Sequence, residues 1–348
     1  MAMQDGRKQP LRAAVIGHPV AHSRSPALFA RFAAATGIAL AYEAVDVAPE
    51  DLVATLARWR ATPDFVGCNV TLPHKERALA LADRAEPAAR ACGAANVLSR
   101  VAAGDSAYDG AVLVADNTDV AGVEAALAQH GVVLRGARVA ILGAGGAARA
   151  VAEAARRSGA ASITIAARDV ARATVVAAEF GAPVIAEDGS APERAEIFRA
   201  TACALDAVPV ADIYVNATPV GMQGQEQTSL LPEDAPRGAA AFDLIYVPEE
   251  TPFLIDARAR GLRTVPGTAM FLAQAVATFE KWFGVTPPHD VTARERPGLI
   301  LRQAQDGILP AHDTSAVHDA SAVRDDSAVR DDSAVRDISA SRDMGRSA

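Results

Sequence analysis

The sequence predicts an α/β protein with two domains, and three observations support this class. At 348 residues, the chain can form two domains and bury a substantial core. Strand-like apolar runs alternate with helix-like runs through the first half. A second alternating series begins near Gly136 and contains a glycine-rich loop after its first strand. We therefore expect one α/β domain followed by another that binds a phosphate-bearing ligand.

Composition and charge narrow the class of protein. Half of the residues are hydrophobic and 5% are aromatic, as in ordinary soluble α/β proteins. The formal net charge of −8 argues against a nucleic-acid partner, which would call for a basic patch. No apolar run is long enough for a membrane span, and the N-terminus lacks the apolar segment of a signal peptide. Cys68, Cys92 and Cys203 lack metal-type spacing. We therefore expect a cytoplasmic protein with no membrane partner and no metal.

The first half alternates regularly between strands and helices. Short apolar or alternating runs predict strands at 11–16, 40–47, 64–69, 94–101 and 110–115. Helical spacing predicts helices that start at Ser25-Pro26 and Pro49, at 75–82 and 86–92, and from Asp119 to about His130. Turn residues at 104–109 separate the last two strands.

The second half repeats the alternation before its composition changes. Strands are expected at 138–142, 162–167, 212–217, 240–246 and 261–265, with a long helix at 267–282. After about Arg302, a six-residue charged repeat begins, with too few apolar residues for a core. We expect residues 1–10 to be a disordered leader and residues 304–348 a disordered tail.

The stretch from Asn69 to Glu76 is the first candidate for chemistry. It follows a predicted strand, and open α/β sheets bind ligands at the carboxyl ends of their strands. It contains Lys75, one of only three lysines in a chain that otherwise uses arginine. Lysine can take part in acid/base chemistry, which arginine cannot do at neutral pH. A solvated lysine at a helix start is the alternative interpretation.

Two serines follow the first predicted strand. Ser25 precedes Pro26 and an Ala-rich run, which is typical of a residue that caps a helix N-terminus. Ser23 has no capping role by this account. A pair of hydroxyls at the end of a strand could also hold a polyhydroxylated ligand.

The run Gly143-Ala144-Gly145-Gly146-Ala147-Ala148 fits the G-x-G-x-x-A pattern of a dinucleotide site. It lies between a predicted strand and a predicted helix, as a Rossmann domain requires. Gly143 permits the tight turn, Gly145 lets the backbone approach a pyrophosphate, and Ala148 allows close packing of helix on sheet. The helix N-terminus favours the anion.

The end of the next strand should select the cofactor. Arg168 and Arg172 favour the 2′-phosphate of NADP, whereas Asp169 favours the ribose hydroxyl of NAD. Alternatively, Asp169 caps the following helix and Arg168 is solvated.

Taken together, these segments resemble the shikimate dehydrogenase family. The matching segments run from about Val15 to Gly284, and their order is more specific than any one of them. They are Ser23-Arg24-Ser25-Pro26, Asn69-Val70-Thr71-x-Pro73-x-Lys75, Gly93-Ala94-Ala95-Asn96, Asp116-Asn117-Thr118-Asp119, the Gly143 loop, Asn216-Ala217-Thr218-Pro219-x-Gly221-Met222 and the Met270–Gln274 helix.

The resemblance implies an NADP-linked reduction of 3-dehydroshikimate to shikimate by a monomer or homodimer. It also implies a substrate domain (11–118 and 266–303) to which the C-terminal helices return after a Rossmann domain (119–265). Lys75 and Asp119 would be the catalytic pair. Hydride addition leaves negative charge on the ketone oxygen, which an ammonium can stabilise and protonate.

The resemblance assigns two further sets of residues. The substrate carboxylate and hydroxyls would be held by Ser23, Ser25, Asn69, Thr71, Asn96, Tyr246 and Gln274. The dinucleotide would be held by Gly143, Ala144, Gly145, Gly146, Ala147, Arg168, Asp169, Arg172, Thr218, Met222 and Gly267. Hydroxyl and amide side chains suit a polyhydroxylated ring, because each buried hydroxyl needs a partner.

The chain departs from the family pattern at three places. Ala167-Arg168-Asp169 replaces the usual Asn-Arg-Thr or Asn-Arg-Ser, Gly267-Thr268-Ala269-Met270 replaces Gly-Leu-Gly-Met, and Ala115 stands where Gly is common. Asp169 is similar to the acid of NAD-linked quinate/shikimate relatives. An NAD-preferring enzyme that also oxidises quinate, and a dinucleotide-binding protein without enzymatic activity, therefore remain alternatives.

Overall fold

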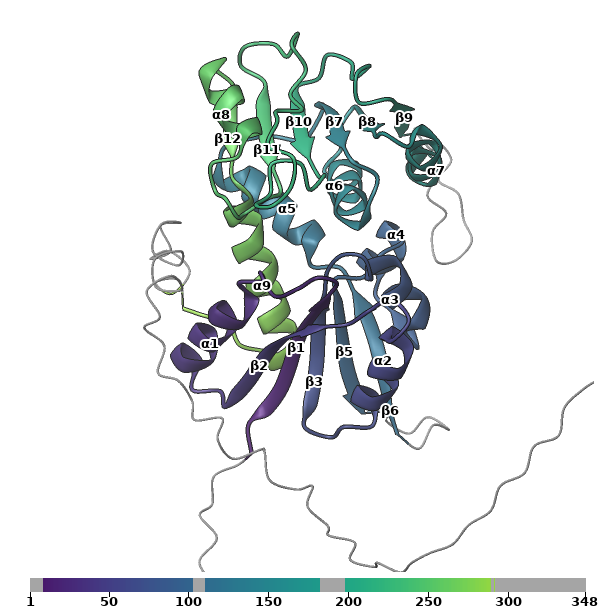
Figure 1. Cartoon of the computed structure of the whole chain (residues 1–348), viewed down its shortest axis with the longest axis vertical. Helices are drawn as coiled ribbons and strands as arrows, with labels where there is room; N and C mark the ends of the chain where they lie inside the picture. The colour runs from purple at the N-terminus through teal and green to yellow at the C-terminus, as the bar shows by residue number, and fades with distance from the viewer. Residues whose placement is uncertain (1–8, 103–109, 182–197, 289–290, 292–348) are drawn as a thin grey trace, which may run out of the picture. The chain divides into compact units, whose positions relative to one another are not determined.

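The computed structural model describes residues 9–102, 110–181, 198–288 and 291, which all belong to one compact unit. The expected leader (apart from residues 9 and 10), the turn at 104–109 and the tail at 304–348 lie outside the described residues. Two six-stranded sheets form within the described part, and helices connect their strands (Figure 1). The α/β class predicted from the sequence is confirmed.

The first sheet is mixed and has the strand order β2-β1-β3-β5-β6-β4. β1 pairs in parallel with both β2 and β3, whereas β5 runs antiparallel to β3 and β6. Its strands are β1 (Leu11–Gly17), β2 (Leu40–Asp46), β3 (Phe65–Val70), β4 (Arg84–Ala85), β5 (Val97–Ala102) and β6 (Ala111–Asp116). Its connecting helices are α1 (Ser25–Thr36), α2 (Leu52–Arg60), α3 (Lys75–Leu81) and α4 (Pro87–Cys92).

The second sheet is entirely parallel and has the strand order β12-β11-β10-β7-β8-β9. This order reverses direction beside β7, the strand that leads into the glycine-rich loop. Its strands are β7 (Arg138–Leu142), β8 (Ser162–Ala166), β9 (Arg199–Cys203), β10 (Ile213–Asn216), β11 (Ala240–Asp243) and β12 (Arg263–Val265). The remaining helices are α5 (Asp119–Gln129), α6 (Gly146–Arg157), α7 (Val170–Gly181), α8 (Pro252–Ala259) and α9 (Gly267–Phe283).

The last helix, α9, packs into two cores. Near its start, Met270 belongs to the apolar cluster of the second sheet. Near its end, Phe279 packs with Phe29 and Phe32 of α1, which follows the first strand of the chain. The C-terminal helix thus returns to the first part of the chain, as expected.

Several sequence predictions need correction. Ser25 does not cap α1: it is the first helical residue, and the preceding Arg24 makes no side-chain cap bond. We expected no capping role for Ser23. Its Oγ nevertheless accepts a hydrogen bond from the Ser25 backbone amide at the start of α1, at 3.3 Å. The helix expected from Pro49 begins at Leu52. β4, β9 and α8 were not predicted; β4 has two residues, too few for a periodic pattern.

The strand expected at 240–246 ends earlier, at Asp243. There the side chain of Asp243 accepts a hydrogen bond from the backbone amide of Ile245 at 3.0 Å. This local bond turns the chain out of the sheet, and an apolar pattern carries no sign of it.

Candidate active site

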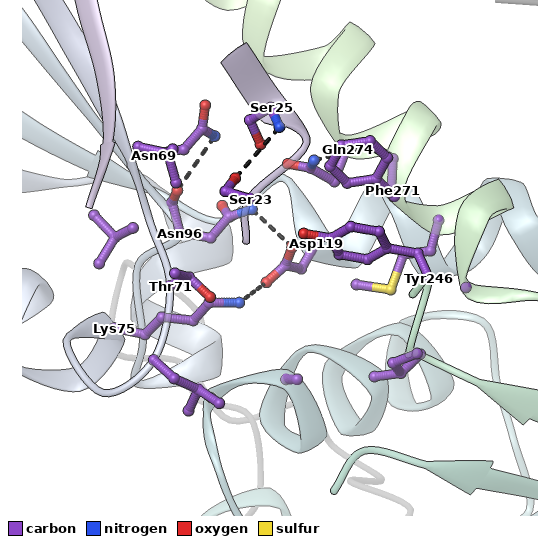
Figure 2. A pocket seen from close by; sticks show the side chains of 18 of the residues that line it. Ser23, Ser25, Asn69, Thr71, Lys75, Asn96, Asp119, Tyr246, Phe271 and Gln274 are labelled. Atoms are coloured by element: carbon purple, nitrogen blue, oxygen red, sulfur yellow. Dashed lines mark hydrogen bonds and ion pairs between the residues drawn. The ribbon is translucent and has the colours of Figure 1, made fainter. Parts of the chain in front are cut away.

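A pocket of about 220 Å³ is lined by every residue that we expect to be catalytic or to bind substrate. These residues come from both halves of the chain, and most lie near strand ends or helix starts. Figure 2 shows their side chains pointing toward one another: Ser23, Ser25, Asn69, Thr71, Lys75, Asn96, Asp119, Tyr246 and Gln274.

Lys75 and Asp119 form an ion pair inside this pocket. The Lys75 Nζ donates to Asp119 Oδ2 at 2.5 Å, and the two side chains are only 14% and 7% exposed. Lys75 is the first residue of α3, and Asp119 is the first residue of α5. A buried ammonium with a carboxylate partner is poised to exchange a proton with a ligand beside it. The interpretation of Lys75 as a solvated lysine is wrong.

Asn96 holds the carboxylate of that pair. Its Nδ2 donates to Asp119 Oδ1 at 2.8 Å and to Thr118 Oγ1 at 3.0 Å. Its Oδ1 accepts from the Thr118 amide at 2.7 Å. Both ends of the Asn96 amide are therefore used, which fixes the orientation of Asp119 toward Lys75.

Asn69 is tied to residues that the sequence analysis did not select. Tyr42 on β2 donates its hydroxyl to Asn69 Oδ1 at 2.8 Å. Asn69 Nδ2 donates to Thr278 Oγ1 on α9 at 3.3 Å. Desolvation raises the pKa of the Tyr42 phenol well above its usual value, so that Tyr42 stays a hydrogen-bond donor. No local sequence signal distinguishes Tyr42 or Thr278, since both gain importance only through tertiary contact.

Ser23, Tyr246 and Gln274 lie at another part of the pocket. Desolvation raises the pKa of the Tyr246 phenol, and hydrogen bonds from the Arg24 backbone and the Ser23 side chain partly offset this effect. The Tyr246 ring stacks on Phe271, with centroids 4.4 Å apart. Gln274 Nε2 donates to the Phe271 carbonyl at 2.9 Å, which leaves its amide oxygen as an acceptor facing the pocket.

The glycine-rich loop fits a dinucleotide. Gly143 has a φ of +119°, a conformation that favours glycine. A Cβ on Gly145 would meet no atom within 4 Å, so the space beside this backbone is open. A Cβ on Gly146 would lie 3.0 Å from Cδ of Lys75, so the loop touches the catalytic candidate directly. Gly145, Gly146 and Ala147 line the pocket, as does Gly267.

The other predicted cofactor residues lie outside the pocket. Arg172 is held at three points: its amide donates to Asp169 Oδ1 at 3.0 Å, its Nε to the Ala144 carbonyl at 2.9 Å, and its Nη2 to Glu76 Oε1 at 2.7 Å. Asp169 therefore caps α7, as one interpretation of the sequence held. Arg168 is exposed and has no side-chain partner among the described residues.

Thr218 and Met222 occupy the loop after β10, also outside the pocket. Thr218 Oγ1 donates to Asn216 Oδ1 at 2.7 Å, and its methyl group would lie 3.3 Å from a Cβ on Gly143. Thr218 thus adjoins the glycine-rich loop. Within the described residues, no cluster of potential metal ligands is present, and no helix is long and apolar enough to cross a membrane.

Asp243 is a buried acid that the sequence analysis did not select. Its carboxylate accepts from Thr251 Oγ1 at 2.6 Å and from Asn216 Nδ2 at 3.2 Å. Burial raises its pKa to about 6. These bonds join the ends of β10 and β11 to the start of α8 and so fix the loop that carries Tyr246.

Comparison with known proteins identifies the family. The family described as "Shikimate dehydrogenase substrate binding domain" matches residues 15–98, and "Shikimate / quinate 5-dehydrogenase" matches residues 125–191. A protein of Mesorhizobium japonicum named shikimate dehydrogenase (NADP(+)) is 42% identical over 82% of this chain and 94% of its own length. The chain belongs to the shikimate dehydrogenase family.

The solved structures that are similar to this chain include two shikimate dehydrogenases with bound ligands. Shikimate 5-dehydrogenase from Thermus thermophilus, in complex with NADP(H) and shikimate, is 35% identical with a TM-score of 0.65, and covers 86% of this chain and 100% of its own. The Listeria monocytogenes enzyme, in complex with shikimate and NAD, is 28% identical with a TM-score of 0.67, and covers 82% and 96%.

Proposed function

We propose that this protein catalyses the reversible NADP-dependent reduction of 3-dehydroshikimate to shikimate. The main support is the Lys75–Asp119 pair in a polar pocket that borders the glycine-rich loop. The Mesorhizobium japonicum relative is named for NADP(+), the Thermus thermophilus structure holds NADP(H) and shikimate, and the Listeria monocytogenes structure holds shikimate and NAD. A binding protein without activity would have no need for a buried acid/base pair.

Each side chain has a distinct role in this proposal. Lys75 donates the proton to the ketone oxygen in reduction and accepts it back in oxidation. Asp119, oriented by Asn96, keeps the ammonium in place and balances its charge. Ser23, Ser25, Asn69, Thr71, Asn96, Tyr246 and Gln274 hold the carboxylate and hydroxyls of the ring.

NADPH, when bound, supplies the hydride that reduces the ketone carbon. We assign its diphosphate to the glycine-rich loop from Gly143 to Ala147, because the start of α6 favours an anion. Arg168 and Arg172 would hold its 2′-phosphate, and Thr218, Met222 and Gly267 would contribute further contacts to the dinucleotide. Asp169 acts through its cap on α7, which holds Arg172 in place.

The division into domains and the assembly state belong to the same proposal. Residues 11–118 and 266–303 form the substrate domain, and residues 119–265 form the dinucleotide domain. We propose a monomer or homodimer in the cytoplasm, where the nicotinamide pool is available. Light scattering of the purified protein would distinguish the two assembly states.

The test measures absorbance at the nicotinamide band with shikimate and quinate, each with NADP⁺ and NAD⁺. We expect turnover of shikimate with NADP⁺ far above the other three pairs. Comparable rates with NAD⁺ and quinate would instead assign the protein to the quinate/shikimate group. No turnover with any pair, with dinucleotide still bound, would contradict an enzymatic role.

A further inference from the structure

Thr278 lies at the centre of a buried hydrogen-bond network behind the pocket. It is completely buried on α9 and does not line the pocket. Its Oγ1 contacts three polar groups from three segments: Asn69 Nδ2 at 3.3 Å, Thr118 Oγ1 at 3.1 Å and the Gln274 carbonyl at 3.0 Å. A hydroxyl has one donor and two acceptor positions, so three partners use it completely.

The direction of these bonds follows from counting hydrogens. The Thr278 hydroxyl donates to the Gln274 carbonyl, because a carbonyl can only accept. It therefore accepts from Asn69 Nδ2 and from the Thr118 hydroxyl. Thr118 Oγ1 in turn accepts from Asn96 Nδ2 at 3.0 Å. In this assignment, the contact between Thr118 Oγ1 and Asn96 Oδ1 at 3.3 Å carries no hydrogen, because the single Thr118 hydroxyl hydrogen points to Thr278.

The network ends at the proposed catalytic pair. Asn96 uses its other amide hydrogen on Asp119 Oδ1, and Asp119 Oδ2 accepts from Lys75. Thr278 thus connects α9, which carries Gln274, to the amides of Asn69 and Asn96. Without the Thr278 hydroxyl, Asn69 Nδ2 would keep, within the described part of the chain, only its longer contact with the Asn96 carbonyl at 3.5 Å. Thr118 would turn toward Asn96 Oδ1, at 3.3 Å.

We propose that Thr278 is a positioning residue for the reaction: its hydroxyl fixes Asn69 and Thr118, and through Asn96 the orientation of Asp119. This proposal rests on the proposed function. It differs from a purely structural role, because a misplaced amide or carboxylate slows turnover even in a fully folded protein.

The test compares Thr278→Val with Thr278→Ser in the oxidation of shikimate by NADP⁺. Valine keeps the shape and removes the hydroxyl, whereas serine keeps the hydroxyl. At a temperature where both variants are folded, we expect the valine variant to lose about 10- to 100-fold in kcat. The serine variant should stay within about threefold of wild type, and the KM for NADP⁺ should change by less than about twofold in both.

Thr36→Val is a matched control. Thr36 makes the same bond to a carbonyl four residues earlier in its helix, that of Phe32, at 2.8 Å, but its other partner is the Ala33 carbonyl of the same helix, at 3.3 Å. Its kcat should equal that of wild type. A folded Thr278→Val protein with wild-type kcat, or a serine variant as slow as the valine variant, would overturn the role of the Thr278 hydroxyl. Wild-type protein inactive on shikimate would overturn the proposed function and, with it, this role.

Discussion

At the scale of single residues, the carboxyl group of Asp243 gives the fold a specific pH dependence. Burial raises its pKa from 3.8 to about 6 in the folded state. A raised pKa means that the folded protein binds this proton more tightly than the unfolded chain does. The resulting stabilisation is fully present below pH 3.8 and is lost as the pH rises through about 6.

A comparison of wild type with Asp243→Asn should reveal this pH dependence, because asparagine does not titrate. Asparagine cannot accept all the bonds that the carboxylate accepts, so the variant should be less stable than wild type at every pH. The difference in the free energy of unfolding should be smaller at about pH 7 than at about pH 4, by up to roughly 3 kcal/mol. Denaturant titrations across this range measure it. A difference that does not vary with pH would contradict the raised pKa.

The sequence alone identified residues whose chemistry is unusual for their surroundings. Lys75 could be selected because the chain has only three lysines, and the glycine-rich loop because of its spacing. Tyr42, Asp243 and Thr278 could not be selected from the sequence. Each is an ordinary residue of a strand or helix until folding places it beside Asn69, Asn216 or Thr118.

At the scale of secondary-structure elements, the start of α9 depends on a close backbone approach. A Cβ on Gly267 would lie 2.3 Å from the carbonyl oxygen of Ile245, which real atoms cannot tolerate. Either α9 or the loop after β11 would have to move, although both carry residues of the pocket. The resemblance assigned Gly267 to the cofactor, and this contact gives the glycine a structural reason as well.

Gly267→Ala should therefore destabilise the protein by about 3 kcal/mol, at the upper end of typical overpacking. Thr268→Ala, at the next position of the same helix, is the control and should change stability by less than about 1 kcal/mol. Chemical denaturation of the two variants measures both effects. Equal stabilities for the two variants would show that the loop after β11 relaxes easily.

Element types were more predictable than element limits. Periodicity located most strands and the long helices, but β11 ends where the Asp243 side chain bonds the backbone. α1 begins at Ser25 rather than after it. α8 was missed although Thr251 precedes it as N-cap and Pro252 is its first residue, with Thr251 Oγ1 accepting from the Leu254 amide. That signal could have been found in the sequence.

At the scale of the whole molecule, Arg172 connects the glycine-rich loop to α3, the helix that begins with Lys75. Its guanidinium contacts the Ala144 carbonyl and the carboxylate of Glu76 on α3. The Arg172 and Glu76 side chains are 54% and 46% exposed, so their ion pair adds little to stability. A contact between residues almost a hundred positions apart could not be read from local pattern.

Arg172→Ala should weaken the binding of NADP⁺ and leave the stability of the fold nearly unchanged. We expect the KM for NADP⁺ to rise about 10- to 100-fold, because a charged partner of the 2′-phosphate is lost. The KM for NAD⁺ should change little, and the free energy of unfolding should fall by less than about 1 kcal/mol. Arg258→Ala removes another exposed ion pair, with Glu250, and controls for loss of charge. Equal increases in KM for both cofactors would contradict recognition of the 2′-phosphate by Arg172.

We propose that Lys75 and Asp119 carry the acid/base step, and the kcat of a Lys75→Ala variant measures this role. The measurement uses shikimate and NADP⁺ at saturation, with circular dichroism to verify the fold. We predict a kcat about 10²–10⁴-fold below wild type, the usual effect of losing such a group. A correctly folded Lys75→Ala protein with near-native kcat would contradict the account.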